Sequence, residues 1–159
     1  MANTSKIYNN DGDNLVVASG GKIAVEAAGG LEIAADFVKG VRFTASYPQV
    51  AAADIAKTFF IAPAACKVIS AYERHVTVAG QAAVMTIEKL TTSEAPGSGD
   101  DLFTVGFDAN STANTPVSKT AVTTAAGTMA AGDALCLKAQ SGNIGSYALG
   151  TVTVTLEWL

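Results

Sequence analysis

The sequence predicts an all-β protein, in which a short N-terminal β-repeat precedes a jelly-roll-like antiparallel β-sandwich. β-Branched and aromatic residues alternate with small or polar ones along most of the chain. Turn-forming Gly, Asn, Asp and Pro recur roughly every 8 to 15 residues. An approximate eight-residue repeat occupies the N-terminal third. Only residues 51–57, "AAADIAK", have the composition of a helical turn.

The clearest strand is "TVTVTLEW" at 151–158, because its apolar and polar residues alternate. The apolar face holds Val152, Val154, Leu156 and Trp158, and the polar face holds Thr151, Thr153, Thr155 and Glu157. Further strands are predicted at 67–78, 83–90, 101–107 and 133–139. The stretch "EKLTTSEAPGSGDDLF" (88–103) is interpreted as the end of one strand, a turn and the start of the next.

The N-terminal repeat consists of "LVVASGGK", "IAVEAAGG" and "LEIAADFV" at 15–22, 23–30 and 31–38. Three such rungs bury too little apolar area to form a core alone, so partner chains are expected to complete it. A trimeric intertwined stalk is the preferred interpretation, and a β-helix-like stack or a hairpin packed on the main domain is the alternative. The candidate trimer-core residues are Leu15, Val17, Ile23, Val25, Leu31 and Ile33.

The predicted domain organisation has four parts. They are a polar arm at 1–14, the Gly-rich repeat at 15–40, a connector at 41–56 and the β-sandwich at 57–159.

Composition limits the partners. Only 15% of the 159 residues are charged, against roughly 25% in an average soluble domain, and this favours self-association. The net charge of −4 and the lack of a Lys/Arg cluster argue against nucleic acid. No apolar segment approaches the roughly 18 residues of a membrane span, and the start "MANTSKIYNNDGDN" does not resemble a signal peptide. We therefore expect synthesis in a cytoplasm.

Cys66 and Cys136 lie in apolar runs and are expected to be buried, reduced thiols, with an inter-strand disulfide as the alternative. With only one histidine and no other cysteine, a Cys-based metal site is not expected. A loose calcium site at "DGDN" (11–14), or at Asp100 and Asp101, is a minor alternative.

No catalytic constellation stands out. The sequence contains no serine in a G-x-S-x-G elbow that could pair with His75, so His75 is expected to be a surface or interface histidine. Cys66 is not expected to be a nucleophile, because Lys67 is its only cationic neighbour in the sequence. Paired carboxylates of the glycosidase kind are conceivable in Glu88 with Glu94, or in Asp100 with Asp101. Since adjacent acids on a turn usually only solvate it, we expect no enzymatic activity and no cofactor.

Carbohydrate binding requires exposed aromatic side chains. Trp158 is expected in the core because it shares the apolar face of the last strand. Tyr47, Tyr72 and Tyr147 remain as scattered candidates.

Two strings, "IEKLTTSEAPGSGDDLFTVGFDANSTANTP" (87–116) and "AAGDALCLKAQSG" (130–142), carry a family resemblance. With the Gly-rich rungs before them, they resemble head fibre or capsid decoration proteins of tailed bacteriophages. The resemblance covers the chain from about residue 11 onward. Ala134 departs from it, because that family often has a basic residue there.

The resemblance implies a homotrimeric virion protein without enzymatic activity. It would bind the major capsid protein on the outer face of the capsid, stabilising the particle or projecting outward for adhesion. Residues 1–14 are the preferred capsid contact, and seating of the sandwich on the capsid is the alternative. Two other functions remain open, a tail-associated receptor-binding module for host surface glycans and a small hydrolase.

Overall fold

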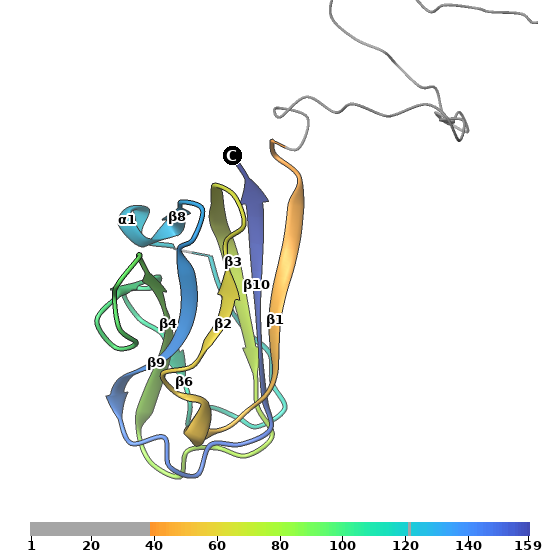
Figure 1. Cartoon of the computed structure of the whole chain (residues 1–159). Coiled ribbons are helices and arrows are strands. Elements are labelled where there is room, and N and C mark those ends of the chain that lie inside the picture. Colours follow the sequence, from red (N-terminus) through yellow and green to blue (C-terminus); the bar gives the residue numbers. More distant parts are fainter. Residues whose placement is uncertain (1–38, 121) are drawn as a thin grey trace, which may run out of the picture. The chain divides into compact units, whose positions relative to one another are not determined.

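The computed structural model describes residues 39–120 and 122–159, which form two antiparallel β-sheets packed face to face (Figure 1). One sheet has the order β1-β10-β3-β7, with β8 also pairing with β3. Its strands are β1 (Arg42–Val50), β10 (Gly150–Trp158), β3 (Cys66–Arg74), β7 (Val117–Lys119) and β8 (Thr128–Met129).

The second sheet has the order β2-β9-β4-β5, with β6 also pairing with β4. Its strands are β2 (Thr58–Ile61), β9 (Ala134–Gly142), β4 (Ala83–Leu90), β5 (Asp100–Asp101) and β6 (Phe107–Asp108). A 3-10 turn at Ala52–Asp54 and the short helix α1 (Thr124–Gly127) are the helical elements of the described residues. The predictions of an all-β chain and of a short helical turn within 51–57 are confirmed.

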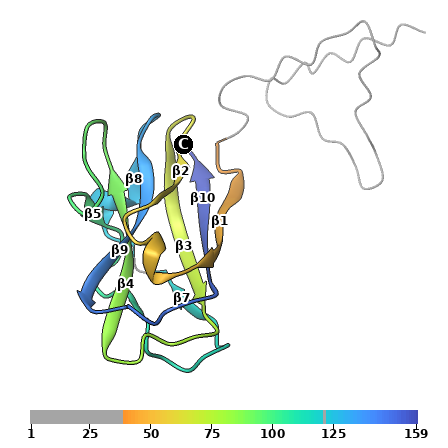
Figure 2. The same cartoon turned by 60° about the horizontal axis from the view of Figure 1, so that its bottom comes forward.

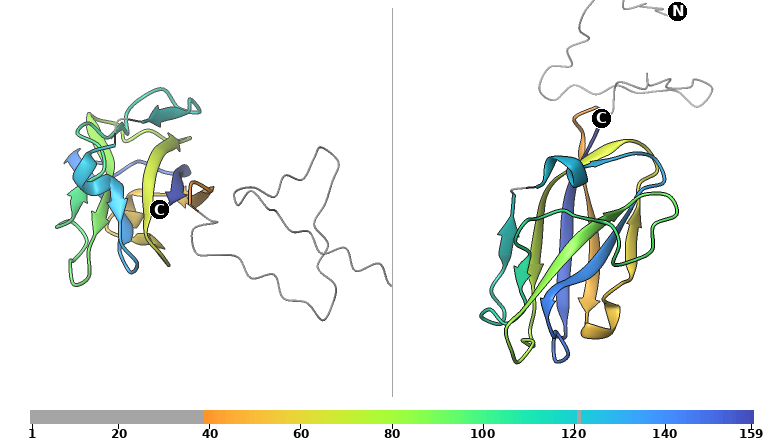
Figure 3. Two further views of the ribbon diagram at one scale, coloured as in Figure 1. Left: turned by 90° about the horizontal axis from the view of Figure 1, so that it is seen from above. Right: turned by 90° about the vertical axis from the view of Figure 1, so that its left-hand side faces the viewer.

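The two-residue alternation of β10 places its apolar face in the core, as predicted. Val152, Val154 and Leu156 are fully buried between the sheets, whereas Thr151 is exposed. Core side chains from the other sheet, such as Ile87 and Leu137, lie in the same cluster. The two layers are seen end-on in the left view of Figure 3.

The structure corrects the domain boundary at 41–56. Residues 42–50 are not a connector, because they form β1 and pair with β10 over almost their whole length. Phe43, Ala45 and Tyr47 pack against the core at every second position. The described sandwich therefore begins with β1, fifteen or so residues before the predicted start at residue 57.

The predicted strand at 101–107 is also wrong. Only its ends pair with β4, as the two-residue strands β5 and β6. Leu102 and Phe103 are both buried although they are adjacent, which a regular strand does not allow on one face. A Cβ atom at Gly106 would overlap the backbone carbonyl of Met85, so the chain approaches β4 too closely for another residue. Apart from β5, the segment from 91 to 106 thus folds as loops against β4 (Figure 2).

The start of β1 and the end of β10 lie together at one end of the sandwich (Figure 1 and Figure 3, right). The backbone N–H of Gly40 donates to the carbonyl of Trp158 at 2.9 Å, and the N–H of Trp158 donates to the carbonyl of Val41 at 3.1 Å. The polar arm at 1–14 and the repeat up to residue 38 lie outside the described residues. Their predicted organisation, like the jelly-roll topology and the trimeric stalk, stays a prediction.

Candidate functional site

The only histidine belongs to a buried polar network and not to the surface. Nδ1 of His75 lies 2.8 Å from Oε1 of Glu73, and the hydroxyl of Tyr147 donates to the same oxygen at 2.6 Å. His75 and Glu73 share the inward face of their segment, while Arg74 between them is exposed. The three side chains are at most 1% exposed, so the expectation of a surface or interface histidine is wrong for this described domain.

The network lacks the hydrogen bond between a histidine and a nucleophile that a catalytic triad requires. Nε2 of His75 lies 3.2 Å from the backbone carbonyl of Ser111, and no hydrogen bond joins it to the Ser111 hydroxyl. A general base must reach the proton of its nucleophile and the substrate, and a fully buried imidazole facing a carbonyl does neither. Burial and the bond to Glu73 also raise the pKa of Tyr147. The geometry therefore supports a stabilising role for this network.

The second buried acid, Glu88, organises the loop that follows its own strand. Oε1 of Glu88 accepts the N–H of Gly97 at 2.6 Å, and Oε2 accepts the N–H of Gly99 at 3.0 Å. Gly97 has φ +93°, and a Cβ at Gly99 would overlap the carbonyl of Lys89, so both positions require glycine. The interpretation of 88–103 as a strand end followed by a turn is confirmed, whereas the strand after it, β5, ends at Asp101 and does not continue to Phe103.

Lys138 on β9 connects this acid with a second one. Its ammonium lies 3.0 Å from Asp101 and 3.6 Å from Glu88, and the hydrogen bond to Asp101 raises the pKa of Lys138. Gln140 donates to the other oxygen of Asp101 at 3.0 Å. The carboxylates are thus occupied by the protein's own donors, which fits the framework role of such groups.

The predicted acid pairs are not brought together as glycosidase pairs. Glu88 is buried, whereas Glu94 lies in the exposed loop and accepts the N–H of Thr91 at 2.6 Å. Asp100 is exposed beside the half-buried Asp101. Within residues 39–120 and 122–159, no group of three His, Cys, Asp or Glu side chains is arranged to hold a metal ion. The "DGDN" segment lies outside those residues.

Both cysteines are buried and free, as predicted. Burial raises the pKa of the Cys66 thiol, and burial together with the nearby Glu88 raises the pKa of Cys136 to about 12. A thiol with such a pKa carries almost no thiolate at neutral pH. Neither cysteine has the environment of a nucleophile.

The feature of the described domain that fits an interaction role is a group of apolar side chains where β1 starts and β10 ends. Val41 is 48% exposed and Leu159 is 44% exposed. Trp158, predicted as core, shares the apolar face of β10 but is only half-buried, and it stacks on Phe43 with 4.2 Å between ring centroids. The ring centroid of Phe60, on β2, lies 6.0 Å from the ring centroid of Phe43. We call these five residues the apolar end.

Sequence reasoning missed most of the apolar end. The alternation in "VRFTASY" (41–47) and the run "TFFI" (58–61) were the signals that could have identified β1 and β2 and their aromatic side chains. The predicted trimer-core residues Leu15 to Ile33 lie outside the described residues. Of the tyrosines, Tyr72 is exposed, Tyr47 is half-buried and stacks on Phe59, and Tyr147 is buried. No aromatic platform for a sugar results from them.

In the described residues, no helix has the length and apolar character needed to cross a membrane. No family model matches the chain, and no curated protein matches it. Among solved structures, the chain has a likeness to the cyanophage Pam1 capsid asymmetric unit, with 13% sequence identity and a TM-score of 0.41. That likeness covers 94% of this chain and 99% of the other.

Proposed function

We propose that this chain is a structural protein of a phage particle, a homotrimeric capsid decoration or head fibre protein on the outer face of the capsid. The observation that carries the proposal is the position of the apolar end. It lies where the described chain begins, at residue 39, and the last predicted rung of the repeat ends at residue 38. Its partner there is a second and third copy of the same chain. The major capsid protein is the partner of the assembled trimer.

Physical reasons favour contact between copies at the apolar end. Val41 and Leu159 expose apolar surface beside three half-buried aromatic rings, and such clusters are favourable to cover. β1 pairs with β10 on one side and is the last strand of its sheet. An edge strand with an open row of backbone groups is stabilised when another chain covers it. A repeat that joins three copies just upstream would hold their apolar ends close together.

Trimerisation also suits attachment to a symmetric capsid. Three individually weak contacts made by one trimer gain affinity through effective concentration, by ~10²–10⁴-fold. We assign the contact with the capsid to residues 1–14 and the outward position to the sandwich. No catalytic activity is included, so turnover of an ester or glycoside substrate by the purified chain would contradict the proposal.

The oligomeric state tests the contact between copies. Light scattering of the full chain is expected to give three times the mass of the 16.1 kDa chain. Trp158 is the only tryptophan, so its quenching by acrylamide reports on the apolar end and is expected to decrease as the trimer forms. Val41→Asp should weaken association, whereas Val105→Asp, at a position 65% exposed outside the apolar end, should not. A monomer at all concentrations would contradict the homotrimer.

Co-sedimentation with capsids that lack the protein tests the partner. The full chain is expected to sediment with the capsids and to raise their thermal stability. Removal of residues 1–14 should abolish sedimentation, and the shortened chain should remain a trimer. Undiminished binding of the shortened chain would refute the assignment of the arm, and no binding by either chain would refute the capsid role.

The second candidate function is a tail-associated or receptor-binding module for host surface glycans. A pocket lined by Lys119 favours it, because β7, which carries Lys119, lies at the opposite edge of its sheet from β1 and leaves this pocket outside the apolar end. Saturable sugar binding without capsid binding would select this function over decoration.

A further inference from the structure

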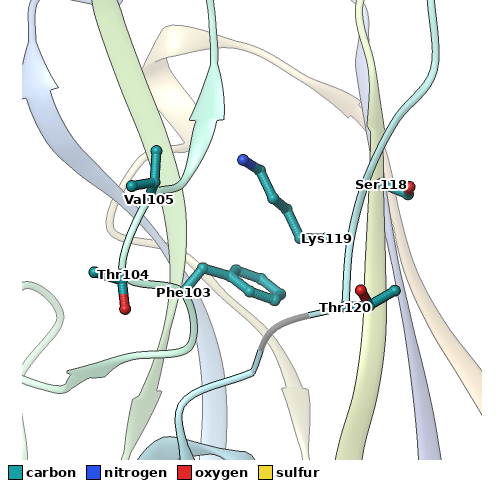
Figure 4. A pocket seen from close by; sticks show the side chains of 6 residues that line it. All are labelled: Phe103, Thr104, Val105, Ser118, Lys119 and Thr120. Carbon is teal, nitrogen blue, oxygen red and sulfur yellow. The ribbon is translucent and has the colours of Figure 1, made fainter.

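A pocket of about 360 Å³ lies between the segment 103–105 and the edge strand β7 (Figure 4). Its lining residues are Phe103, Thr104, Val105, Ser118, Lys119 and Thr120. This volume is within the roughly 300–1,000 Å³ of small-molecule sites. It is not part of the buried networks or of the apolar end.

Both walls of the pocket are held by the fold. Phe103 packs edge-on against Phe107, with 5.8 Å between the ring centroids. The side-chain amide of Gln140 donates to the carbonyls of Phe103 and Thr104 at 3.2 and 3.3 Å. On the other wall, Lys119 pairs with Ala71 in the β3–β7 ladder. A ligand would therefore bind without the cost of ordering a loop.

Lys119 supplies the charge of the pocket. Its side chain extends into the space between the two walls in Figure 4, and it is half-buried. Lys57, Lys67 and Lys138 pair with carboxylates at 2.8, 2.7 and 3.0 Å, whereas no carboxylate of the described residues forms an ion pair with Lys119. An ammonium group with apolar surroundings and no internal counter-ion attracts an external anion.

The remaining lining residues limit the kind of anion. Val105 offers an exposed apolar side chain, and the ring of Phe103 closes the base of the pocket. The lining also includes Thr104, Ser118 and Thr120, whose side chains point away from Lys119 in Figure 4. The lining contains no arginine and no helix N-terminus, the groups that give a phosphate its bidentate or multiple N–H contacts, so a carboxylate suits the single charge of Lys119 better. A ring-shaped ligand with a carboxylate and an apolar face matches Lys119 on one wall and Val105 on the other, and its remaining polar groups would face the solvent.

We propose that this pocket binds a single sugar ring that carries a carboxylate, with the carboxylate on Lys119 and the ring against Val105. The inference deepens the second candidate function, since it names the ligand class of a glycan receptor. It does not depend on trimer formation or on the capsid contact. Sugar binding and capsid binding can therefore fail separately.

The test uses the isotope-labelled full chain, titrated with glucuronate while amide signals are followed by NMR. Glucuronate is expected to shift the signals of residues 103–105 and 118–120 in a saturable way. Glucose presents the ring without the charge, and acetate presents the charge without the ring. Each should therefore bind at least about tenfold more weakly than glucuronate. Equal binding of glucose would refute the role of the charge, and equal binding of acetate would refute the sugar.

Lys119→Gln is the decisive variant, because it keeps most of the side chain and removes the positive charge. It should weaken glucuronate binding by about tenfold or more. Lys57→Gln is the matched control, since Lys57 is an exposed lysine outside the pocket. The affinity of this variant for glucuronate should equal that of the parent chain. An absence of saturable binding by the full chain, or equal binding by Lys119→Gln, would overturn the assignment.

Discussion

The carboxylate of Glu88 accepts the backbone N–H of Gly97 at 2.6 Å, nine positions further along the chain. An acid that is fully buried is stable only if its oxygens find donors, and the loop after β4 supplies two of them. Glu88 and the loop thus depend on each other. The acid-rich stretch after β4 is part of the framework of the sandwich.

Replacement of Glu88 by Gln should loosen this loop. One acceptor oxygen is replaced by an NH₂ group that faces a backbone donor, and the ion pair with Lys138 is lost. We expect the free energy of unfolding to fall by about 2 kcal/mol. In hydrogen exchange, the amides of Gly97 and Gly99 should lose protection. Glu94→Gln, at an exposed position of the same loop, is the control, and an equal effect of both variants would contradict the role of Glu88.

Tyr147→Phe should destabilise the sandwich by about 2 kcal/mol, because it removes a buried hydrogen bond to a carboxylate. Urea unfolding measures this change. Tyr72→Phe, at a position that is 48% exposed, should have little effect. If both variants unfold at the same urea concentration as the parent, the Glu73–His75–Tyr147 network contributes no stability.

Gly150→Ala should also destabilise the fold, by about 1–3 kcal/mol. A Cβ at this position would lie 2.6 and 2.7 Å from two ring carbons of Tyr147, and it would overlap the hydroxyl group. Thermal unfolding followed by circular dichroism gives the measurement. Gly145→Ala is the matched control, because the nearest atom there belongs to the exposed side chain of Asn143, at 3.0 Å.

Acid should destabilise the protein through its surface ion pairs. Lys67, and then Arg42, lower the pKa of Glu157, and Lys57 lowers the pKa of Asp54. Since each folded pKa lies below its ordinary value, the unfolded chain binds these protons first as the pH falls. The stability from Glu157 is therefore complete above its ordinary pKa of 4.5 and is lost as the pH falls through the folded pKa. The melting temperature should decline below about pH 4.5, and less steeply for Glu157→Gln.

The two thiols should not react while the protein is folded. Burial raises the pKa of both, that of Cys136 to about 12, and it also blocks access. A chromogenic disulfide reagent at pH 8 should therefore react only after denaturant is added. Rapid reaction of either thiol with the native chain would show that the region around it opens readily.

The sequence by itself determined the class of the fold and the faces of its longest strands. The alternation in β10 predicts which side chains are buried, because successive residues of a strand point to opposite faces. The Pro and Gly residues after Glu88 predict a turn, since few other residues adopt the backbone angles found there. These are local properties, and neighbouring residues determine them.

The tertiary structure alone decided what covers each face. His75 has a polar sequence context, and it is buried because Tyr147, 72 positions away, and the carbonyl of Ser111 lie against it. The segment 101–107 has strand composition, yet only its ends, Asp101 and Phe107, pair with β4, and Gly106 lies too close to the backbone of β4 for any other residue. β1 joins the sandwich through its pairing with β10, more than 100 positions away. Alternation predicts that a face is apolar or polar, whereas burial depends on long-range contacts that only the assembled sheets supply.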